Sequence, residues 1–346
     1  MNRAKPIIHV VSAGGTIAGT GVSATEFTYE SVELSAADLV AAVEGLDRDV
    51  EIRADTLFTI GSQDLGPVQW LKLAQHVQVL AARADVDGIV VTHGTDTLEE
   101  AAFFLDLVCR TEKPLVLTGA MRPATALSAD GPRNLYQAVV AASAPQLRGG
   151  GVMVVINGLL LPGWQVVKAN SIALDAFRAY PGGPAGRFMG GTLILTETPR
   201  PAPLAGAFHG HLAKSADFPL VGIAYVQGGC GDAPIRVWHE SKCKGLVIAA
   251  FGAGTMSQPI ADAARDLAAE GCVVVVSSRV GEVAVHVESM TGRGRGGLLP
   301  SGFLNPQKSA TLLGFALAGG QQAPEVGQLF DLFSAHPHGI AYEAAS

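Results

Sequence analysis

Two short segments place a threonine directly after a glycine at the end of an apolar run, and a threonine hydroxyl can act as a nucleophile. The first is Ala13–Gly19, which contains Thr16, and the second is Thr92–Glu100, which contains Thr95. A hydroxyl attacks at neutral pH only when a neighbouring group takes its proton. Glycine allows backbone N–H groups to turn toward a ligand, where they can stabilise the oxyanion of a tetrahedral intermediate. These residue types indicate acyl transfer, and Asp96 could hold a cationic group of the substrate.

Each loop taken alone also fits a purely structural interpretation, a glycine turn followed by a threonine that caps a helix. Nucleotide-binding interpretations fit poorly. Gly14 to Gly19 has the G-x-x-x-x-G spacing without the following Lys-Ser/Thr, and it does not match G-x-G-x-x-G. A metal motif is not apparent either, because the four cysteines form no C-x-x-C pair and His209 and His211 have no third ligand nearby in the sequence. We expect the cysteines to be buried, reduced thiols.

The elements that position these loops are predicted from apolar runs and helix signals. Runs rich in β-branched residues without strict alternation predict strands that are covered on both faces. They are Ile7–Ser12, Val50–Ala54, Gly88–Thr92, Pro114–Thr118, Val152–Asn157, Val221–Val226, Leu246–Ala250 and Cys272–Ser277. Helices are predicted to begin at Pro67, at Thr97 with Glu100 as a capping box, and near Pro259 with an end at Gly271. In such α/β folds, reactive groups lie in loops at the carboxyl ends of strands.

The order of these elements predicts an α/β protein with a mostly parallel sheet in each of two domains. Pro199, Pro201 and Pro203 fall in a stretch without clear periodicity, which is typical of a linker. We therefore predict a catalytic domain at residues 1–196, a linker at 197–219 and a smaller α/β domain at 220–346. A length of 346 residues is sufficient for two cores.

Charge and hydropathy exclude several classes of partner. The formal net charge is −7, and nucleic acids or anionic membranes would require clustered Lys and Arg, so we expect neither as a partner. No apolar run approaches the ~20 residues of a membrane-spanning helix. The apolar stretch after Pro6 is too short for a secretory signal, and we expect a cytoplasmic protein.

Several motifs in combination resemble the bacterial L-asparaginases, especially their two-domain type II members. Besides the two glycine–threonine loops, the matching stretches are Ile60–Asp64, Thr118–Pro123, Ser128–Pro132, Ser277–Val280 and Ser301–Lys308. They occur in order along nearly the whole chain. The resemblance implies a larger flavodoxin-like domain and a smaller α/β domain, a tetramer built as a dimer of dimers with active sites between subunits, and no metal or organic cofactor.

The resemblance also implies roles for particular residues. Thr16 corresponds to the primary nucleophile, with Tyr29 assisting its deprotonation. Thr95 corresponds to the second catalytic threonine, with Lys168 as its partner, and burial would favour the neutral amine of such a lysine. Asp96 would hold the α-ammonium group of the substrate. The remaining substrate-binding residues implied in this way are Gly15, Ser62 and Gln63.

Two positions depart from the pattern of type II enzymes. Ala253 stands where the neighbouring subunit usually contributes an asparagine, and Met290 stands where it contributes a glutamate, with Glu288 two residues away. We expect the threonine–lysine chemistry to persist and substrate selection to shift, toward weaker use of glutamine.

The sequence thus predicts an amidohydrolase that cleaves the side-chain amide of L-asparagine to L-aspartate and ammonia through an acyl-enzyme on Thr16. One alternative is an amidase for another small amide, such as glutamine, a D-amino-acid amide or a peptide amide. Another is a catalytically silent relative that binds an amino acid.

Overall fold

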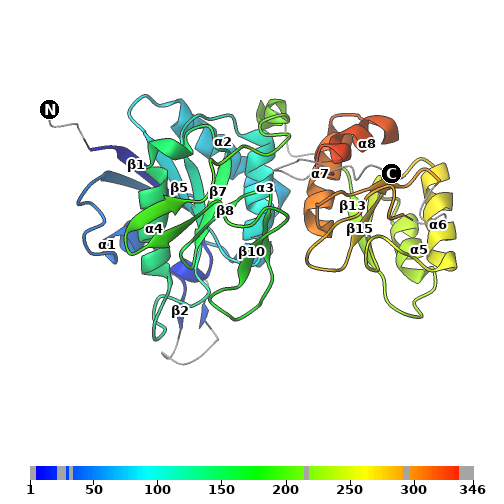
Figure 1. Ribbon diagram of the computed structural model, residues 1–346, viewed down its shortest axis with the longest axis horizontal. Coiled ribbons are helices and arrows are strands. Elements are labelled where there is room, and N and C mark those ends of the chain that lie inside the picture. Colours follow the sequence, from blue (N-terminus) through cyan, green and yellow to red (C-terminus); the bar gives the residue numbers. More distant parts are fainter. Residues whose placement is uncertain (1–4, 22–28, 31–33, 214–217, 291–295, 335–346) are drawn as a thin grey trace, which may run out of the picture. The chain divides into compact units, whose positions relative to one another are not determined.

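The computed structural model of the protein describes residues 5–21, 29–30, 34–213, 218–290 and 296–334. The chain folds into two compact units (Figure 1). The larger unit comprises residues 1–179 and 183–216, and the smaller comprises residues 180–182 and 217–346. The predicted boundaries at 1–196, 197–219 and 220–346 stay a prediction. The described part of residues 197–219 is packed rather than extended, since Gly206 N and Phe208 N donate to the carbonyls of Asp106 and Leu107, at 2.8 and 2.9 Å.

The larger unit is built on one eight-stranded sheet whose central strands are parallel. The strand order is β12-β11-β8-β7-β6-β5-β1-β4. Its parallel strands are β1 (Ile7–Ser12), β4 (Glu51–Thr56), β5 (Gly88–Thr92), β6 (Leu115–Thr118) and β7 (Val152–Ile156). The chain passes from β1 to β4 on one side and then crosses to β5 on the other side of β1. This order, 2-1-3-4-5 when the parallel strands are counted along the chain, is the flavodoxin-like one, and its switch point lies between β1 and β5.

Helices cover both faces of this sheet. The cluster of buried residues on one face joins the even positions of β1, Ile8 and Val10, to α1 (Ala36–Ala41) and α4 (Gly131–Ala142). The opposite face carries α2 (Pro67–Ala82) and α3 (Leu98–Val108), which pack against each other and against β5 and β7. Burial on both faces explains why β1, β5 and β7 are nearly all apolar. Short 3-10 turns η1 (Thr16–Ala18) and η2 (Ser62–Asp64) follow β1 and β4.

Antiparallel strands on one side of the sheet, and two separate two-stranded sheets, were absent from the predicted strands. Asn157 and Gly158 adopt positive φ angles of 49° and 76° and join β7 to β8 (Leu159–Pro162), as a two-residue Asn-Gly turn does. The other short strands are β2 (Thr20–Gly21), β3 (Tyr29–Glu30), β9 (Val166–Lys168), β10 (Phe177–Ala179), β11 (Gly186–Met189) and β12 (Thr192–Leu195). The 3-10 turns η3 (Pro145–Leu147) and η4 (His209–Ala213) also belong to this unit.

The smaller unit has a four-stranded parallel sheet with helices on both faces (Figure 1). Its strands are β13 (Val221–Tyr225), β14 (Gly245–Ala250), β15 (Val273–Ser278) and β16 (Leu299–Pro300), and its helices are α5 (Ala233–Glu240), α6 (Gln258–Ala269), α7 (Pro306–Ala318) and α8 (Ala323–Asp331). α5 and α6 pack together on one face, and α7 packs on the other. The predicted α/β class with mostly parallel sheets is confirmed.

All eight predicted strands and all three predicted helices are present, with ends that differ by at most two residues. One local detail is wrong. Thr97 is the N-cap residue of α3, but its hydroxyl makes no cap hydrogen bond and donates to the Ser62 carbonyl at 2.8 Å, so the capping box with Glu100 does not form. Among the described residues, no helix is long and apolar enough to cross a membrane.

Candidate active site

The two glycine–threonine loops leave adjacent strands at the switch point of the larger sheet. In the strand register, Ser12 of β1 stands beside Thr92 of β5, and Thr92 stands beside Thr118 of β6. The loops that contain Thr16 and Thr95 therefore start at the same end of the parallel strands. This is the carboxyl end, where open α/β sheets bind ligands.

Glycines bring the two loops into contact. A Cβ atom built on Gly15, whose φ is +92°, would overlap the backbone of Gly94 and lie 3.1 Å from the His93 carbonyl carbon. Gly15 and Gly94 are the residues directly before Thr16 and Thr95. Only residues without a side chain allow this approach, so the two threonines follow points where the backbones touch. Both threonines are buried, with exposed fractions of 6% and 5%.

Lys168 brings its side-chain amine to the second loop. Its Nζ donates hydrogen bonds to Thr95 Oγ1 at 3.0 Å and to Asp96 Oδ1 at 2.6 Å. The Lys168 side chain is 16% exposed, whereas the Asp96 side chain is 56% exposed. The hydroxyl, the amine and the carboxylate thus form one continuous hydrogen-bonded group at the end of β5. A deprotonated amine in this position can accept the proton of the Thr95 hydroxyl.

A residue that sequence reasoning missed positions this lysine. Glu99, in the first turn of α3, is 3% exposed and accepts a hydrogen bond from the Lys168 backbone N–H at 2.6 Å. It fixes β9 against the start of α3, which sets the distance between Lys168 and Thr95. In the sequence, Glu99 is indistinguishable from an ordinary acidic residue at a helix start. Only its burial reveals the role.

The segment after β4 packs on the second loop. A Cβ atom built on Gly94 would lie 2.6 Å from Ser62 Cβ, and the Ser62 carbonyl accepts the hydrogen bond from Thr97. Ser62 is buried, at 3% exposed. Gln63 is exposed, and its amide donates to Asp64 Oδ2 at 3.4 Å. The structure therefore brings Gly15, Thr16, Ser62, Thr95, Asp96 and Lys168 to one edge of the sheet. Tyr29 lies in β3, and its side chain falls outside the described residues.

The loop also contains a fully buried histidine. His93 Nδ1 donates a hydrogen bond of 2.8 Å to the Gly94 carbonyl. Burial disfavours its charged form and lowers the pKa of His93 to about 4, although the hydrogen bond to Gly94 opposes the shift. The imidazole is therefore neutral at pH 7. Its position between β5 and Thr95 makes it part of the scaffold that holds the loop.

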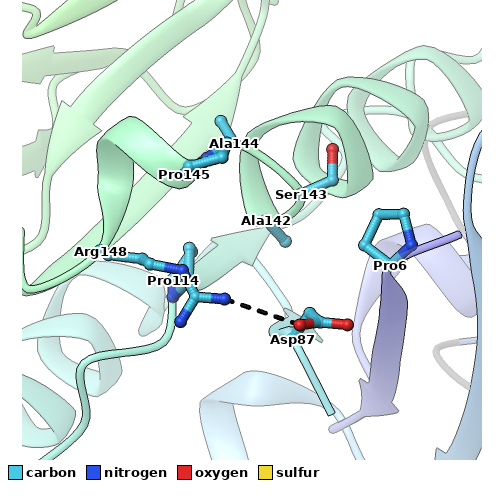
Figure 2. Close-up of a pocket in the computed structure, with 8 residues that line it drawn as sticks. All are labelled: Pro6, Asp87, Pro114, Ala142, Ser143, Ala144, Pro145 and Arg148. Atoms are coloured by element: carbon cyan, nitrogen blue, oxygen red, sulfur yellow. Dashed lines mark ion pairs between the residues drawn. The ribbon is translucent and has the colours of Figure 1, made fainter. Parts of the chain in front are cut away.

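A pocket in the larger unit lies at the opposite, amino-terminal ends of the same strands. Figure 2 shows this pocket, of about 320 Å³, lined by residues that include Pro6, Asp87 and Pro114. These three residues directly precede β1, β5 and β6. The pocket therefore lies at the amino ends of the parallel strands, opposite the two threonine loops, and contributes nothing to the candidate active site.

Comparison with known protein families agrees with this geometry. The family model described as "Asparaginase, N-terminal" matches residues 7–201, and the model "Glutaminase/Asparaginase C-terminal domain" matches residues 220–330. Together they cover nearly all of the two units. The chain belongs to the L-asparaginase family. The resemblance inferred from the motifs is confirmed.

Individual relatives of this family match over almost the full length. L-asparaginase 2 of Escherichia coli (strain K12) is 36% identical over 330 residues, which are 95% of this chain and 94% of that protein. A glutaminase-asparaginase of Pseudomonas fluorescens biotype A is 35% identical, covering 93% of this chain and 89% of that protein. The crystal structure of a probable cytoplasmic L-asparaginase from Campylobacter jejuni superposes with a TM-score of 0.87 at 34% identity, over 94% of this chain and 99% of that one.

The two positions that depart from type II asparaginases differ in their surroundings. Ala253 is exposed in the glycine-rich turn between β14 and α6. Met290 is 2% exposed and belongs to the apolar core of the smaller unit. Glu288, two residues earlier, is exposed. A methionine at position 290 therefore serves packing, whereas the carboxylate of Glu288 is accessible.

Proposed function

We propose that this member of the L-asparaginase family hydrolyses the side-chain amide of L-asparagine to L-aspartate and ammonia. The observation that carries the proposal is the hydrogen-bonded group Thr95–Lys168–Asp96 beside the loop that contains Thr16. It supplies a hydroxyl, an amine and a carboxylate beside a second buried hydroxyl, the group types that an acyl transfer through a covalent intermediate uses.

In the proposed reaction, Thr16 Oγ1 attacks the amide carbon and its proton is transferred with the assistance of Tyr29. The tetrahedral intermediate then collapses, the C–N bond breaks, and the amide nitrogen leaves as ammonia with the proton that it gains. This step leaves an ester on Thr16. Thr95 and Lys168 accept a proton from water, which attacks the ester, and aspartate leaves as the Thr16 hydroxyl reforms. Backbone N–H groups of Gly15 and Thr95 stabilise the oxyanion.

Three side chains select the substrate in this proposal. Ser62 and Gln63 hold the α-carboxylate, and Asp96 holds the α-ammonium group. The exposed position of Asp96, beside an amine that it already contacts, suits a carboxylate that must reach a cationic ligand. No metal or organic cofactor takes part.

A second candidate is an amidase that also uses glutamine or another small amide. It is favoured by the relative named a glutaminase-asparaginase and by the departures at Ala253 and Met290. We nevertheless expect glutamine to be the poorer substrate. Steady-state ammonia release from asparagine, glutamine and D-asparagine separates these candidates, and glutamine turnover as fast as asparagine turnover would contradict the preference.

We further propose a cytoplasmic homotetramer, arranged as a dimer of dimers, with a catalytic domain at 1–196 and a smaller domain at 220–346. The cytoplasmic location is supported by the similarity to the probable cytoplasmic L-asparaginase from Campylobacter jejuni and by four free cysteines, three of them buried. Light scattering on the purified protein would measure the assembly directly, and cell fractionation would measure the location.

The central test is ammonia release by the wild type and by a Thr16→Ala variant. Loss of a nucleophile in a concerted catalytic group lowers kcat by roughly 10⁴- to 10⁶-fold. The matched control is Thr192→Ala, an exposed threonine on the edge strand β12, which should retain wild-type kcat. A folded wild type that binds asparagine and releases no ammonia from any amide would instead support the silent amino-acid-binding relative.

A further inference from the structure

Two histidines and an aspartate converge at the outermost strands of the larger sheet. His9 of β1 and His76 of α2 both approach the same carboxylate oxygen of Asp55 in β4. The distances from Nε2 to Asp55 Oδ2 are 2.7 Å for His9 and 3.3 Å for His76. One potential ligand atom from each of the three side chains lies within 4.8 Å of the others.

The alternation of strand side chains explains this convergence. Ile8 and Val10 of β1 and the neighbouring Ile52 and Ala54 of β4 pack on the face that carries α1 and α4. His9 and Asp55 must therefore point to the other face, where α2 presents His76. His9 is only 4% exposed, so its ring is held in a polar site inside an otherwise apolar layer.

Hydrogen bonds among the described residues leave two imidazole nitrogens of the group unused, one on each histidine. Only His9 makes a hydrogen bond with Asp55 of acceptable geometry. His76 Nε2 is a buried atom without a hydrogen-bond partner among the described residues, although it lies 3.3 Å from the carboxylate. A buried polar atom without a partner is unfavourable, and it points here to a ligand that would satisfy both imidazoles and the carboxylate together.

We infer that His9, Asp55 and His76 form a binding site for a divalent transition-metal cation, of which Zn²⁺ is the best match. Two imidazoles and one carboxylate are a ligand set typical of Zn²⁺, and water completes the tetrahedron. Bonds of about 2.0–2.1 Å place tetrahedral ligands about 3.3 Å apart. The His76–Asp55 distance already has this value, and the His9–Asp55 distance must widen. Asp55, whose side chain is 47% exposed, has room for that movement.

Nearby charges permit a cation at this position. The guanidinium groups of Arg53 and Arg83 lie close by, but both form ion pairs with Asp85, and Arg53 also pairs with Glu51. Their positive charge is thus compensated within the surface network. His9 Nδ1 has no hydrogen-bond partner among the described residues. Because a partner on the second nitrogen strengthens a histidine ligand by on the order of ten- to hundredfold, we expect reversible binding rather than a permanently loaded site.

The ion would fasten the edge strand β4 to β1 and α2. β4 is the last strand of the sheet, pairs with β1 alone among the described strands, and has no fully buried residue. Because binding to the folded state alone raises the melting temperature, the site would act as a structural clamp. This site is distinct from the proposed active site, and it does not depend on the proposed asparaginase activity.

The test uses full-length protein without a histidine tag, freed of metal with a chelator that is then removed. Titration calorimetry with Zn²⁺ should show one ion per chain, and scanning calorimetry should show a higher Tm with Zn²⁺. Asp55→Asn and His76→Gln should each weaken binding at least tenfold and remove the Tm increase. Both side chains are partly exposed, so the variants should fold, which circular dichroism checks. Replacement by Co²⁺ should give the visible absorption of a nitrogen–oxygen site in the wild type alone.

The matched control is His239→Gln, which breaks the exposed pair of His239 with Glu270 (2.7 Å) in the smaller unit. This variant should bind Zn²⁺ as the wild type does. Mg²⁺ and Ca²⁺, which prefer oxygen ligands, should not compete. Wild-type Zn²⁺ affinity in both Asp55→Asn and His76→Gln would overturn the inference, as would the absence of any binding by the wild type. Ammonia release measured on the same samples reports separately on the proposed function.

Discussion

The amine of Lys168 contacts Thr95 and Asp96, and the two contacts differ in what they can contribute to stability and to catalysis. The hydrogen bond to Thr95 links two groups shielded from water, whereas the bond to Asp96 joins the amine to a side chain that is 56% exposed. The exposed ion pair contributes little stability. The value of the arrangement is therefore chemical, because it holds an amine at a fixed distance from a hydroxyl.

Replacing Lys168 with methionine should lower kcat for asparagine by about 10²- to 10⁴-fold, the usual contribution of a positioned proton acceptor. Lys168→Arg should not restore kcat, because a guanidinium stays protonated. Steady-state ammonia release measures both. Lys72→Met, at an exposed position on α2, is the control and should leave kcat unchanged. A Lys168→Met enzyme within threefold of the wild type would remove Lys168 from the mechanism.

His93 should make the stability of the protein depend on pH. Its pKa is about 4 in the folded state, against 6.5 for the free side chain, so the unfolded chain binds more protons between these values. The full stability is present above pH 6.5 and is lost as the pH falls toward 4, by roughly 3 kcal/mol at about 1.4 kcal/mol per unit. Urea unfolding at several pH values across this range gives the free energy of unfolding as a function of pH. This free energy should fall less steeply with decreasing pH in His93→Gln than in the wild type. Equal pH dependence in the two proteins would refute the role given to His93.

At the scale of secondary-structure elements, the site depends on the close approach of the loops that follow β1 and β5. β1 and β5 end in register, but this alone would leave the following loops about a strand spacing apart. Gly15 and Gly94 allow the backbones to touch. The closeness of the two threonines is therefore a property of the glycines that precede them.

Gly15→Ala should abolish activity and destabilise the protein, because it adds both an unfavourable φ of +92° and an overlap with Gly94. The strain alone costs of order 1–3 kcal/mol. The matched control is Gly183→Ala, where φ is +86° and no atom lies within 4 Å of the new Cβ. The control should lose a similar amount through strain and keep its kcat. Thermal unfolding and ammonia release on both variants separate the two effects, and an active Gly15→Ala enzyme would contradict the argument.

On the scale of the whole molecule, the smaller unit contains Ala253, Glu288 and Met290, the positions that the family resemblance singled out. Its core encloses Met290, while Ala253 and Glu288 stay exposed. If a neighbouring subunit completes each active site, as the family resemblance implies, the exposed positions are the ones that can contribute groups to it. The buried position cannot do so without repacking the core.

Met290→Glu should lower the free energy of unfolding by roughly 2–5 kcal/mol, because it places a carboxylate in an apolar core. Ala253→Asn, at an exposed position, should change stability by less than about 0.5 kcal/mol. In the proposed tetramer it should raise kcat/KM for asparagine by about fivefold, the effect of one neutral hydrogen bond of about 1 kcal/mol. Urea unfolding and steady-state kinetics measure these changes. Unchanged kinetics in Ala253→Asn would argue against its place in the site.

Local patterns in the amino-acid sequence were sufficient to predict eight of the parallel strands, the starts of α2, α3 and α6, the α/β class and the family. Those features depend on periodicity and on motifs, which are complete within short segments such as Ala13–Gly19. The same patterns identified Thr16, Thr95 and Asp96 as candidates, whereas Lys168 came only from the resemblance. The short antiparallel strands, such as β8 after the Asn157-Gly158 turn, were missed because runs of two to four residues carry too little pattern of their own.

Which distant residues meet became known only from the folded chain. Glu99 and Lys168 are separated by 69 positions in the chain, and His9 and Asp55 by 46. No local pattern specifies such pairs, because they depend on strand order, on register and on which face of the sheet a side chain occupies. The same reason explains the hydrogen bond of the Thr97 hydroxyl. The local pattern predicts a bond within the helix that follows, whereas in the folded chain the hydroxyl donates to the Ser62 carbonyl.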